Sequence, residues 1–427
     1  MKMPKTPPSL DEVFSEKHLS LRDVATEENI QLALSFNSKC LHWDEVRRRG
    51  TGSTDPKVIW ALMMLFRKNN LTNIEIGGIK VRYSMINSFQ WMLHEIDVRS
   101  SAGFVSKEIS NPKAAKAYAV SSLMEESIAS CQIEGADMAT RVAKTMLREG
   151  RTPKTESEKM IFNNYKAMLF IKENKDKKLS LELILEIHGI ITNDTLENDS
   201  FEGRLRETDD VVVQDKLTGD VFHVPPESKD LKQMISSLCE YANSDEPFVH
   251  PIVKGVVIHF MTAFIHPFVD GNGRLARSLL YWYALKKGYW IFEYLAISRT
   301  IKGHRGKYDR AYVLSETDGN DITYFIQYNL NCIEEALGSF IHYLNNKVSE
   351  QKELNLSISE NPDLNKRQKM ILRDAMRAGE PFSIPEIRSK YQVSYQTASS
   401  DVNKLLGKGL IKEYGKVWRK VLYVVHD

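Results

Sequence analysis

Apolar residues recur at helical spacing along most of the chain. Leu181, Ile184, Leu185 and His188, for example, fall on one face of an α-helix. Similar patterns continue to about residue 345. We therefore expect a mainly α-helical protein.

One passage departs from helical spacing. The runs VVVQ at 211–214 and VFHV at 221–224 are rich in β-branched and aromatic residues, and they flank the turn-forming sequence DKLTGD. Pro225 and Pro226 end the second run, because proline cannot donate to a strand ladder. The passage predicts a small β-hairpin.

The stretch SEQKELNLSISENPDLN at 349–365 is polar and only weakly periodic, which is typical of a linker. It separates the helical body from a C-terminal module. We therefore expect a helical N-terminal extension at 1–110, a central domain at 111–345, a linker at 346–365 and a separate module at 366–427.

The C-terminal module has the pattern of a winged helix-turn-helix domain. A helix at 366–377 and two further helical segments precede the runs IKEYGK and VLYVV, which flank a Gly-Lys turn. Ser394 is placed as an N-cap, and Tyr395 to Leu406 would form the recognition helix. The side chains expected to face a groove or to contact phosphate are Tyr395, Gln396, Thr397, Ser400, Lys404, Lys416, Arg419 and Lys420.

Charge is distributed unevenly between the two parts of the chain. The module holds 13 Lys or Arg against 6 Asp or Glu, whereas residues 1–365 hold 45 against 50. The local positive charge suits DNA as a partner of the module, but winged helices also serve as protein-binding or dimerising modules, so both kinds of partner stay open. Over the whole chain the 58 basic and 56 acidic residues nearly cancel, so the total charge gives no argument for nucleic acid or a membrane surface.

The remaining composition indicates a cytoplasmic setting. Four scattered cysteines have neither the spacing of a zinc site nor the density of a disulfide scaffold. No stretch approaches the roughly 20 apolar residues of a membrane span, and the first residues lack the apolar core of a secretory signal. We expect no membrane partner.

The densest group of chemically active residues is HPFVDGNGRLAR at 266–277. It lies between two segments of helical spacing, the first beginning near Pro251. A glycine-rich loop before a helix N-terminus directs free backbone N–H groups toward one point, which is how proteins cradle phosphate. Asp270 offers the hard oxygen ligand that Mg²⁺ prefers, and Arg274, Arg277 and Asn272 can bind phosphate oxygens. His266 can remove a proton, since histidines ordinarily titrate near neutrality.

Two other interpretations apply to the same glycines. Residues 271–276 also fit the dinucleotide fingerprint G-x-G-x-x-G/A, but that fingerprint requires a preceding strand where this sequence predicts a helix. A plain glycine turn between packed helices would explain the glycines, but it would leave the five functional groups beside them unexplained.

Residues 266–277 resemble the signature of the Fic family, H-x-F-x-[DE]-G-N-G-R-x-x-R, at all eight fixed positions. The resemblance implies that 111–345 is a Fic-type helical catalytic domain and that the hairpin is the family's flap, on which a target segment lies by β-augmentation. Gly203-Arg-Leu-Arg206 resembles the family's G-x-x-R sequence before that flap. The resemblance to the Fic family also implies that ATP, with Mg²⁺, is the substrate. A Ser, Thr or Tyr hydroxyl of a target protein would then attack the α-phosphorus.

The resemblance assigns a role to each matching position. His266 would be the general base and Asp270 the magnesium ligand. The nucleotide would be held by Phe268 as a buried anchor, by Gly271, Asn272 and Gly273 as the anion-binding turn, by Arg274 at the distal phosphates and by Arg277 near the γ-phosphate.

Ser130-Cys-Gln-Ile-Glu134-Gly135 resembles the Fic inhibitory motif, [ST]-x-x-x-E-[GN], in the class with an N-terminal inhibitory helix. The residues from Ala119 to Ile133 predict a helix that Gly135 would end. The resemblance implies that Glu134 pairs with Arg277 and keeps it from the γ-phosphate. The alternative is a surface glutamate at a helix end.

We therefore predict a protein adenylyltransferase that is inhibited by its own Glu134 and that modifies a protein target or itself. Removal of AMP, both activities together, and a DNA-binding regulator whose core only senses nucleotide stay open as alternatives. The donor is a further open point, because a few family members transfer UMP, GMP or phosphocholine. Appended modules of this kind recur in bacterial Fic proteins, which favours a bacterial source. A homodimer is also left open.

Overall fold

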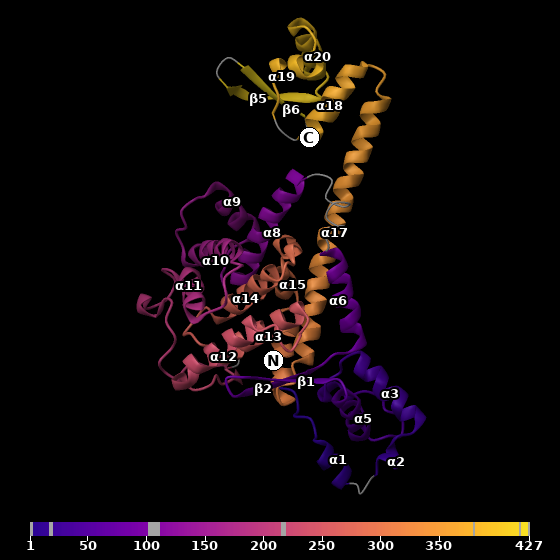
Figure 1. Cartoon of the computed structure of the whole chain (residues 1–427), viewed down its shortest axis with the longest axis vertical. Helices are drawn as coiled ribbons and strands as arrows, with labels where there is room; N and C mark the ends of the chain where they lie inside the picture. Colours follow the sequence, from indigo (N-terminus) through magenta and orange to yellow (C-terminus); the bar gives the residue numbers. More distant parts are fainter. Residues whose placement is uncertain are drawn as a thin grey trace. The chain divides into compact units, whose positions relative to one another are not determined.

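The computed structural model in Figure 1 describes residues 3–16, 20–100, 112–214, 219–378, 381–417 and 420–425. The chain divides into two compact units. The larger unit comprises Met1–Val105 and Tyr118–Gly338, and the smaller unit comprises Ser106–Ala117 and Ser339–Asp427. Two helices belong to both units, namely α8 at Pro112–Ile133 and α17 at Thr323–Glu360.

The larger unit is built on two central helices, α13 at Pro251–Ile265 and α14 at Asn272–Lys286 (Figure 1). Both are buried along most of their length; α13 is mostly apolar, whereas α14 also buries Asn272, Arg274, Arg277 and Ser278. The helices that surround them are α9 at Thr140–Glu149, α10 at Glu156–Glu173, α11 at Leu181–Thr192, α12 at Leu231–Asn243, α15 at Ile297–Gly303 and α16 at Arg305–Thr317. Short 3₁₀ turns lie at Asp199–Phe201, Ser228–Asp230 and Trp290–Tyr294.

The predicted hairpin between α11 and α12 is present. Strand β3 at Val213–Gln214 pairs antiparallel with β4 at Val221–His223. Its strands are shorter than the sequence runs that predicted them. Residues 215–218 of the predicted turn lie outside the described residues.

The N-terminal extension is not wholly helical as predicted. Its helices are α1 at Leu10–Glu16, α2 at Leu21–Val24, α3 at Glu27–Ser38, α4 at Trp43–Val46, α5 at Pro56–Lys68 and α6 at Asn87–Arg99. Between α5 and α6, strands β1 at Leu71–Ile76 and β2 at Ile79–Ser84 form an antiparallel hairpin. Its turn consists of Gly77 and Gly78 with φ of 57° and 80°, the left-handed pair that a tight hairpin requires.

Most of the predicted linker is helical, because α17 continues to Glu360. The residues from 349 to 360 include the good helix formers Glu, Lys, Gln and Leu, and they contain neither Gly nor Pro. The helix ends just before Asn361-Pro362, where proline disfavours helical geometry in the preceding residue. The weak periodicity was therefore not evidence for irregular structure.

The smaller unit has the predicted order of elements. They are α18 at Lys366–Ala378, α19 at Ile384–Tyr391, α20 at Tyr395–Gly407, β5 at Ile411–Val417 and β6 at Lys420–Val425. Ile371, Leu372, Val402 and Leu405 are buried in its separate core. The predicted turn position was wrong, since Gly415 lies within β5 beside a register shift and the strand continues to Val417. Arg419 lies outside the described residues, and assignment to the winged-helix class stays a prediction.

Among the helices of the described ranges, none is both long and apolar enough to cross a membrane.

The β1–β2 turn provides a test of how the N-terminal extension packs on the rest of the larger unit. A Cβ at Gly77 would lie 2.7 Å from the Cα of Met234 in α12, whereas a Cβ at Gly78 would meet nothing within 4 Å. Both alanine substitutions carry the cost of a left-handed residue, about 1–2 kcal/mol. We expect Gly77→Ala to lower the free energy of unfolding by more than Gly78→Ala in urea denaturation. Equal losses would contradict the close packing of this turn on α12.

Candidate active site

The loop between α13 and α14 has the geometry of an anion-binding turn. Helix α13 begins at Pro251 and ends at Ile265, because the next residue, His266, has left-handed φ of 49° and ψ of 58° that stop the helix. Helix α14 begins after Gly271, which has φ 84° and no side chain to cap the helix. The first N–H groups of α14 therefore have no capping side chain from Gly271. Because a helix precedes the loop, the dinucleotide-fold interpretation is wrong.

Two hydrogen bonds between Phe268 and Asn272 hold the loop in shape. The backbone N–H of Phe268 donates to Oδ1 of Asn272 at 3.0 Å, and Nδ2 of Asn272 donates to the carbonyl of Phe268 at 2.8 Å. Both side chains are buried. Asn272 therefore holds the loop in shape through its side chain, whereas the sequence predicted that it would bind the nucleotide.

His188 of α11 supports the same loop. Its ring stacks on Phe268 with centroids 3.6 Å apart. Its Nε2 donates to the carbonyl of Asp270 at 2.9 Å, and its Nδ1 accepts from the N–H of Gly203 at 3.1 Å. Burial lowers the pKa of His188 to about 4, so the ring is neutral. Sequence reasoning missed this role, although one histidine on the apolar face of α11 was the signal for it.

Arg274, in the first turn of α14, forms an ion pair with Asp270 of the loop. Its side chain is fully buried, with Nη2 3.0 Å from Oδ2 of Asp270 and Nη1 donating to the carbonyl of Ile191 at 3.2 Å. The Asp270 carboxylate is 60% exposed. In this conformation Arg274 is an internal partner of Asp270, and its predicted contact with distal phosphates stays a prediction.

Arg277, one turn further along α14, is bound by the end of α8. Its Nη2 lies 2.7 Å from Oε1 of Glu134, and Nε donates to Oγ of Ser130 at 2.9 Å. The same Nη2 also donates to the carbonyl of Ser130 at 3.0 Å. The Arg277 side chain is 3% exposed, against 27% for Glu134. The structure thus brings together the residues of the predicted inhibitory pair.

The Glu134 carboxylate lies directly against the first turn of α14. A Cβ at Gly273 would lie 2.9 Å from the carboxyl carbon of Glu134 and 3.2 Å from Nη1 of Arg277. Burial raises the pKa of Glu134, but the charges of Arg277 and Arg305 outweigh burial and leave it below its ordinary value. An ionised carboxylate therefore occupies the place where a helix N-terminus and an arginine favour an anion.

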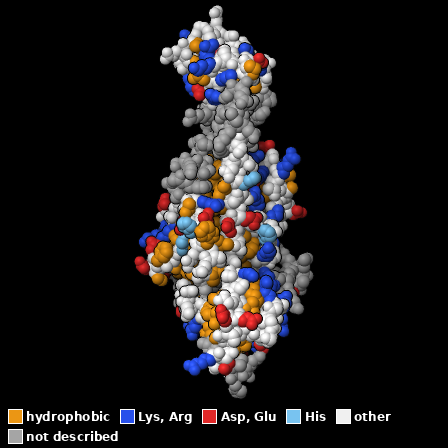
Figure 2. Space-filling model, turned by 90° about the vertical axis from the view of Figure 1, so that its right-hand side faces the viewer, with side chains coloured by type: hydrophobic (Ala, Val, Ile, Leu, Met, Phe, Trp, Pro, Cys, Tyr) orange, Lys and Arg blue, Asp and Glu red, His pale blue; other side chains and the backbone are white. Residues whose placement is uncertain are grey.

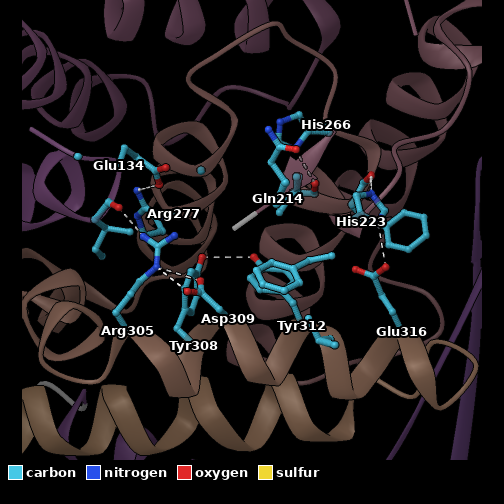
Figure 3. Close-up of a pocket in the computed structure, with 18 residues that line it drawn as sticks. Glu134, Gln214, His223, His266, Arg277, Arg305, Tyr308, Asp309, Tyr312 and Glu316 are labelled. Carbon is cyan, nitrogen blue, oxygen red and sulfur yellow. Dashed lines mark hydrogen bonds and ion pairs between the residues drawn. The ribbon is translucent and has the colours of Figure 1, made fainter. Parts of the chain in front are cut away.

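His266 faces the same cavity as Glu134 and Arg277 (Figure 3). Its Nδ1 lies 3.2 Å from the carbonyl of Ala263, which can only accept, so Nδ1 carries the proton and Nε2 has the lone pair. Burial lowers the pKa of His266 to about 4, so the ring is neutral at pH 7. The free lone pair on Nε2 can accept a proton, but the lowered pKa makes the ring a weaker base than an ordinary histidine.

Arg206 connects this site to the residues around the hairpin. Its buried guanidinium donates from Nε to the carbonyl of His266 at 3.0 Å and from Nη2 to the carbonyl of Pro226. Its backbone N–H donates to the carbonyl of Pro267 at 2.9 Å. One side chain therefore holds the residues on both sides of the hairpin to the peptide that carries the imidazole.

The cavity has a volume of about 370 Å³ and is lined by the end of α8, the hairpin, the α13–α14 junction and α16. Of the predicted residues it is lined by Glu134, Gly135, His266, Gly273 and Arg277. Its other wall is α16, which sequence reasoning missed. That wall contributes Arg305, Tyr308, Asp309, Tyr312, Val313 and Glu316 (Figure 3).

His223 joins the hairpin to both walls of the cavity. Its Nε2 lies 2.7 Å from the carbonyl of Phe264 in α13, and its Nδ1 lies 2.8 Å from Oε2 of Glu316 in α16. Strand β4 is therefore held beside the left-handed end of α13 by a side chain that also contacts α16.

Comparison with known proteins agrees with this geometry. Residues 178–284 match the family model described as the Fic/DOC family, so this segment of the chain is similar to that family. It is 27% identical over 168 residues to a protein adenylyltransferase Fic of Nematostella vectensis and 31% identical over 170 residues to one of Aedes aegypti. These matches cover 39% of this chain but only 35% and 30% of the two relatives, so the chain spans about a third of their length. Both relatives are animal proteins and lend no support to a bacterial source.

Two solved structures share the fold. A Fic family protein from Desulfovibrio desulfuricans aligns with 81% of this chain and 97% of its own at 17% identity and a TM-score of 0.53. Residues 134–508 of Fic-1 from C. elegans align with 80% of this chain and 90% of that one at 15% identity and a TM-score of 0.50. The chain therefore has a mainly helical Fic fold with small two-stranded sheets.

The ion pair between Glu134 and Arg277 predicts a pH-dependent contribution to stability. Because the folded-state pKa of Glu134 lies below its ordinary value of 4.5, its ionised form stabilises the fold above pH 4.5, and this stabilisation is lost as pH falls through the folded-state pKa. We expect Glu134→Gln to lower the free energy of unfolding at pH 7 by about 1 kcal/mol. In urea denaturation the difference from the native chain should shrink at pH 4. A difference that did not change with pH would contradict the ion pair.

Proposed function

We propose that this chain is a protein adenylyltransferase that moves AMP from ATP to a Ser, Thr or Tyr hydroxyl of a protein target, and that Glu134 inhibits it. The observation that carries the proposal is the Glu134 carboxylate bound to Arg277 against the first turn of α14, in the cavity that His266 also lines. The similarity to proteins named protein adenylyltransferase supports AMP as the transferred group.

The proposed reaction uses groups that already lie around the cavity. Nε2 of His266 accepts the proton of the incoming hydroxyl, whose oxygen forms a bond to the α-phosphorus. The bond from the α-phosphorus to the oxygen that bridges to the β-phosphate breaks, and pyrophosphate leaves. The N–H groups at the start of α14 and the guanidinium of Arg277 bind phosphate oxygens once Glu134 has left them.

Asp270 is the residue that would hold Mg²⁺. The described parts of the chain contain no group of three His, Cys, Asp or Glu placed to hold a metal ion, so nucleotide phosphates would have to complete the shell. The exposed carboxylate of Asp270, at the edge of the loop, fits that arrangement. A bound Mg²⁺ would neutralise phosphate charge.

The hairpin is proposed as the docking edge for the target. Strand β4 is held to the end of α13 by His223, so a segment added to the hairpin would lie at a set distance from His266. Removal of AMP by a water that Glu134 positions stays an alternative. The presence of His266 favours an enzyme over a protein that only senses nucleotide, because a sensor needs no general base.

The smaller unit is proposed to bind DNA. Lys and Arg side chains gather on the face of this unit that Figure 2 displays. Tyr395, Gln396, Ser400 and Lys404 are exposed on α20, whereas Ala398, Val402 and Leu405 face the core. An exposed polar helix face beside basic strands suits a groove and its phosphates, with a protein partner as the other outcome.

The first test concerns His266. We expect His266→Ala to reduce AMP transfer by about 10²- to 10⁴-fold, the usual effect of losing a general base, while ATP binding is retained. His266→Asn is the matched control for backbone strain, because asparagine tolerates the left-handed conformation of this position. Transfer can be followed as the mass gain of a modified protein, and binding by calorimetry. Transfer at the native rate in either variant would rule out this role.

The second test concerns the inhibition by Glu134. We expect Glu134→Gly to raise AMP transfer well above the native rate, because Arg277 then becomes available to the γ-phosphate. The double variant Glu134→Gly, Arg277→Ala should lose that gain, since the relief acts through the arginine. Rates of self-modification measured with each nucleoside triphosphate would also identify the donor. Equal rates in the single and double variants would exclude competition for Arg277.

The third test concerns the smaller unit. We expect DNA affinity to fall steeply as salt rises, because phosphate contacts release counterions. Lys404→Ala should weaken binding without changing AMP transfer, since Lys404 belongs to the smaller unit and is not among the residues that line the cavity. Fluorescence anisotropy with a labelled duplex at several salt concentrations gives both quantities. Binding that did not depend on salt, or on Lys404, would favour a protein partner instead.

A further inference from the structure

Cations of α15 and α16 contact the part of α8 that leads to Glu134. The contacts follow α8 toward its C-terminal end, so successive cations hold successive parts of the inhibitory helix. They join Arg299 to Glu125 at 2.8 Å, Lys302 to the side-chain oxygen of Gln132 at 2.7 Å, and Arg305 to the backbone carbonyl of Ile133.

The contact made by Arg305 differs from the other two. Ile133 is the last residue of α8, and the carbonyl groups at a helix end have no partner within the helix. A cation placed there is also favoured by the helix dipole. The carbonyl of Ile133 belongs to the peptide group that leads into Glu134. Fixing that peptide fixes the direction in which the Glu134 side chain leaves the backbone.

Arg305 is itself held in place for this contact. Its Nε lies 2.9 Å from both carboxylate oxygens of Asp309, one turn later on α16. Figure 3 shows Arg305 extending from α16 beside Arg277, toward the segment that carries Glu134. The charge of Arg305 also helps to keep the Glu134 carboxylate ionised.

We propose that Arg305 is the positioning residue of the inhibitory contact: it fixes the C-terminal end of α8 so that Glu134 stays on Arg277. The inference rests on the proposed function and adds to it a residue outside both sequence motifs. Without Arg305 the last peptide of α8 loses its partner, and the carboxylate spends more time away from Arg277. The anion site is then open to the nucleotide more often.

The test is the rate of AMP transfer by full-length Arg305→Ala. We expect a rise of about tenfold, the factor that loss of one charge-assisted hydrogen bond produces, and never above the rate of Glu134→Gly. Arg305→Lys keeps a cation near the carbonyl of Ile133, so its rate of AMP transfer should rise less. Arg299→Ala, on the neighbouring helix α15, is the matched control, because it removes an ion pair to the same helix α8 but leaves the end of α8 untouched. Its rate should equal the native rate.

A second measurement separates positioning from a general loss of structure. In the Glu134→Gly background, Arg305→Ala should give no further gain, because the group that Arg305 positions is already absent. A further rise, or a fall in both backgrounds, would overturn the inference, as would a single Arg305→Ala no faster than the native chain. If Glu134→Gly itself gave no gain, the inhibitory role of Glu134 would fail, and the inference with it. A gain in Glu134→Gly but none in Arg305→Ala would refute the inference alone.

Discussion

One guanidinium cannot bind two anions in the same place, and the site is arranged around that constraint. Arg277 is almost fully buried, and Ser130 binds it through both its hydroxyl and its carbonyl. The position of the Arg277 guanidinium is therefore set by α8 and α14 together. Its N–H groups that Ser130 does not bind lie beside the first turn of α14. In the structure the Glu134 carboxylate binds the guanidinium there. Removing a buried arginine's partner leaves an uncompensated charge, so the pair persists until another anion replaces the carboxylate.

Most polar side-chain groups of the loop and of the first turn of α14 bond within the protein, although Nε of Arg274 is buried with no hydrogen-bond partner in the described residues. Asn272 binds the backbone of Phe268, and Arg274 binds Asp270 and a carbonyl of α11. Buried polar groups need such partners, because an unmet donor or acceptor costs roughly 1–3 kcal/mol. Much of the motif therefore maintains the shape of the loop. In the proposed function, the groups left for chemistry are the imidazole of His266, the guanidinium of Arg277, the exposed carboxylate of Asp270 and the backbone at the start of α14.

The sequence was most informative where a motif specifies the residues of the site. The helix–loop–helix around His266 was predicted from the long motif at 266–277, and the pairing of Glu134 with Arg277 from resemblance to the shorter inhibitory motif at 130–135. The inward orientation of Asn272 and Arg274 was not, since residue type does not say which way a side chain points. The contribution of α16 was missed because its residues reach the cavity only through tertiary packing. The β1–β2 hairpin was missed although Gly77-Gly78 lies between alternating residues, a signal that the helical pattern on either side obscured.

The contact between Glu134 and the start of α14 makes the carboxylate a tethered ligand of the anion site. A tethered group acts at an effective concentration on the order of millimolar or higher, set by how tightly its tether is held. A dissolved triphosphate has to compete against that local concentration. Every contact that holds the end of α8 more firmly therefore raises the nucleotide concentration at which Glu134 is displaced from Arg277 in half of the molecules. In the proposed function, the inhibited fraction of molecules therefore depends on the nucleotide concentration, and the rigidity of the end of α8 sets the concentration range of that response.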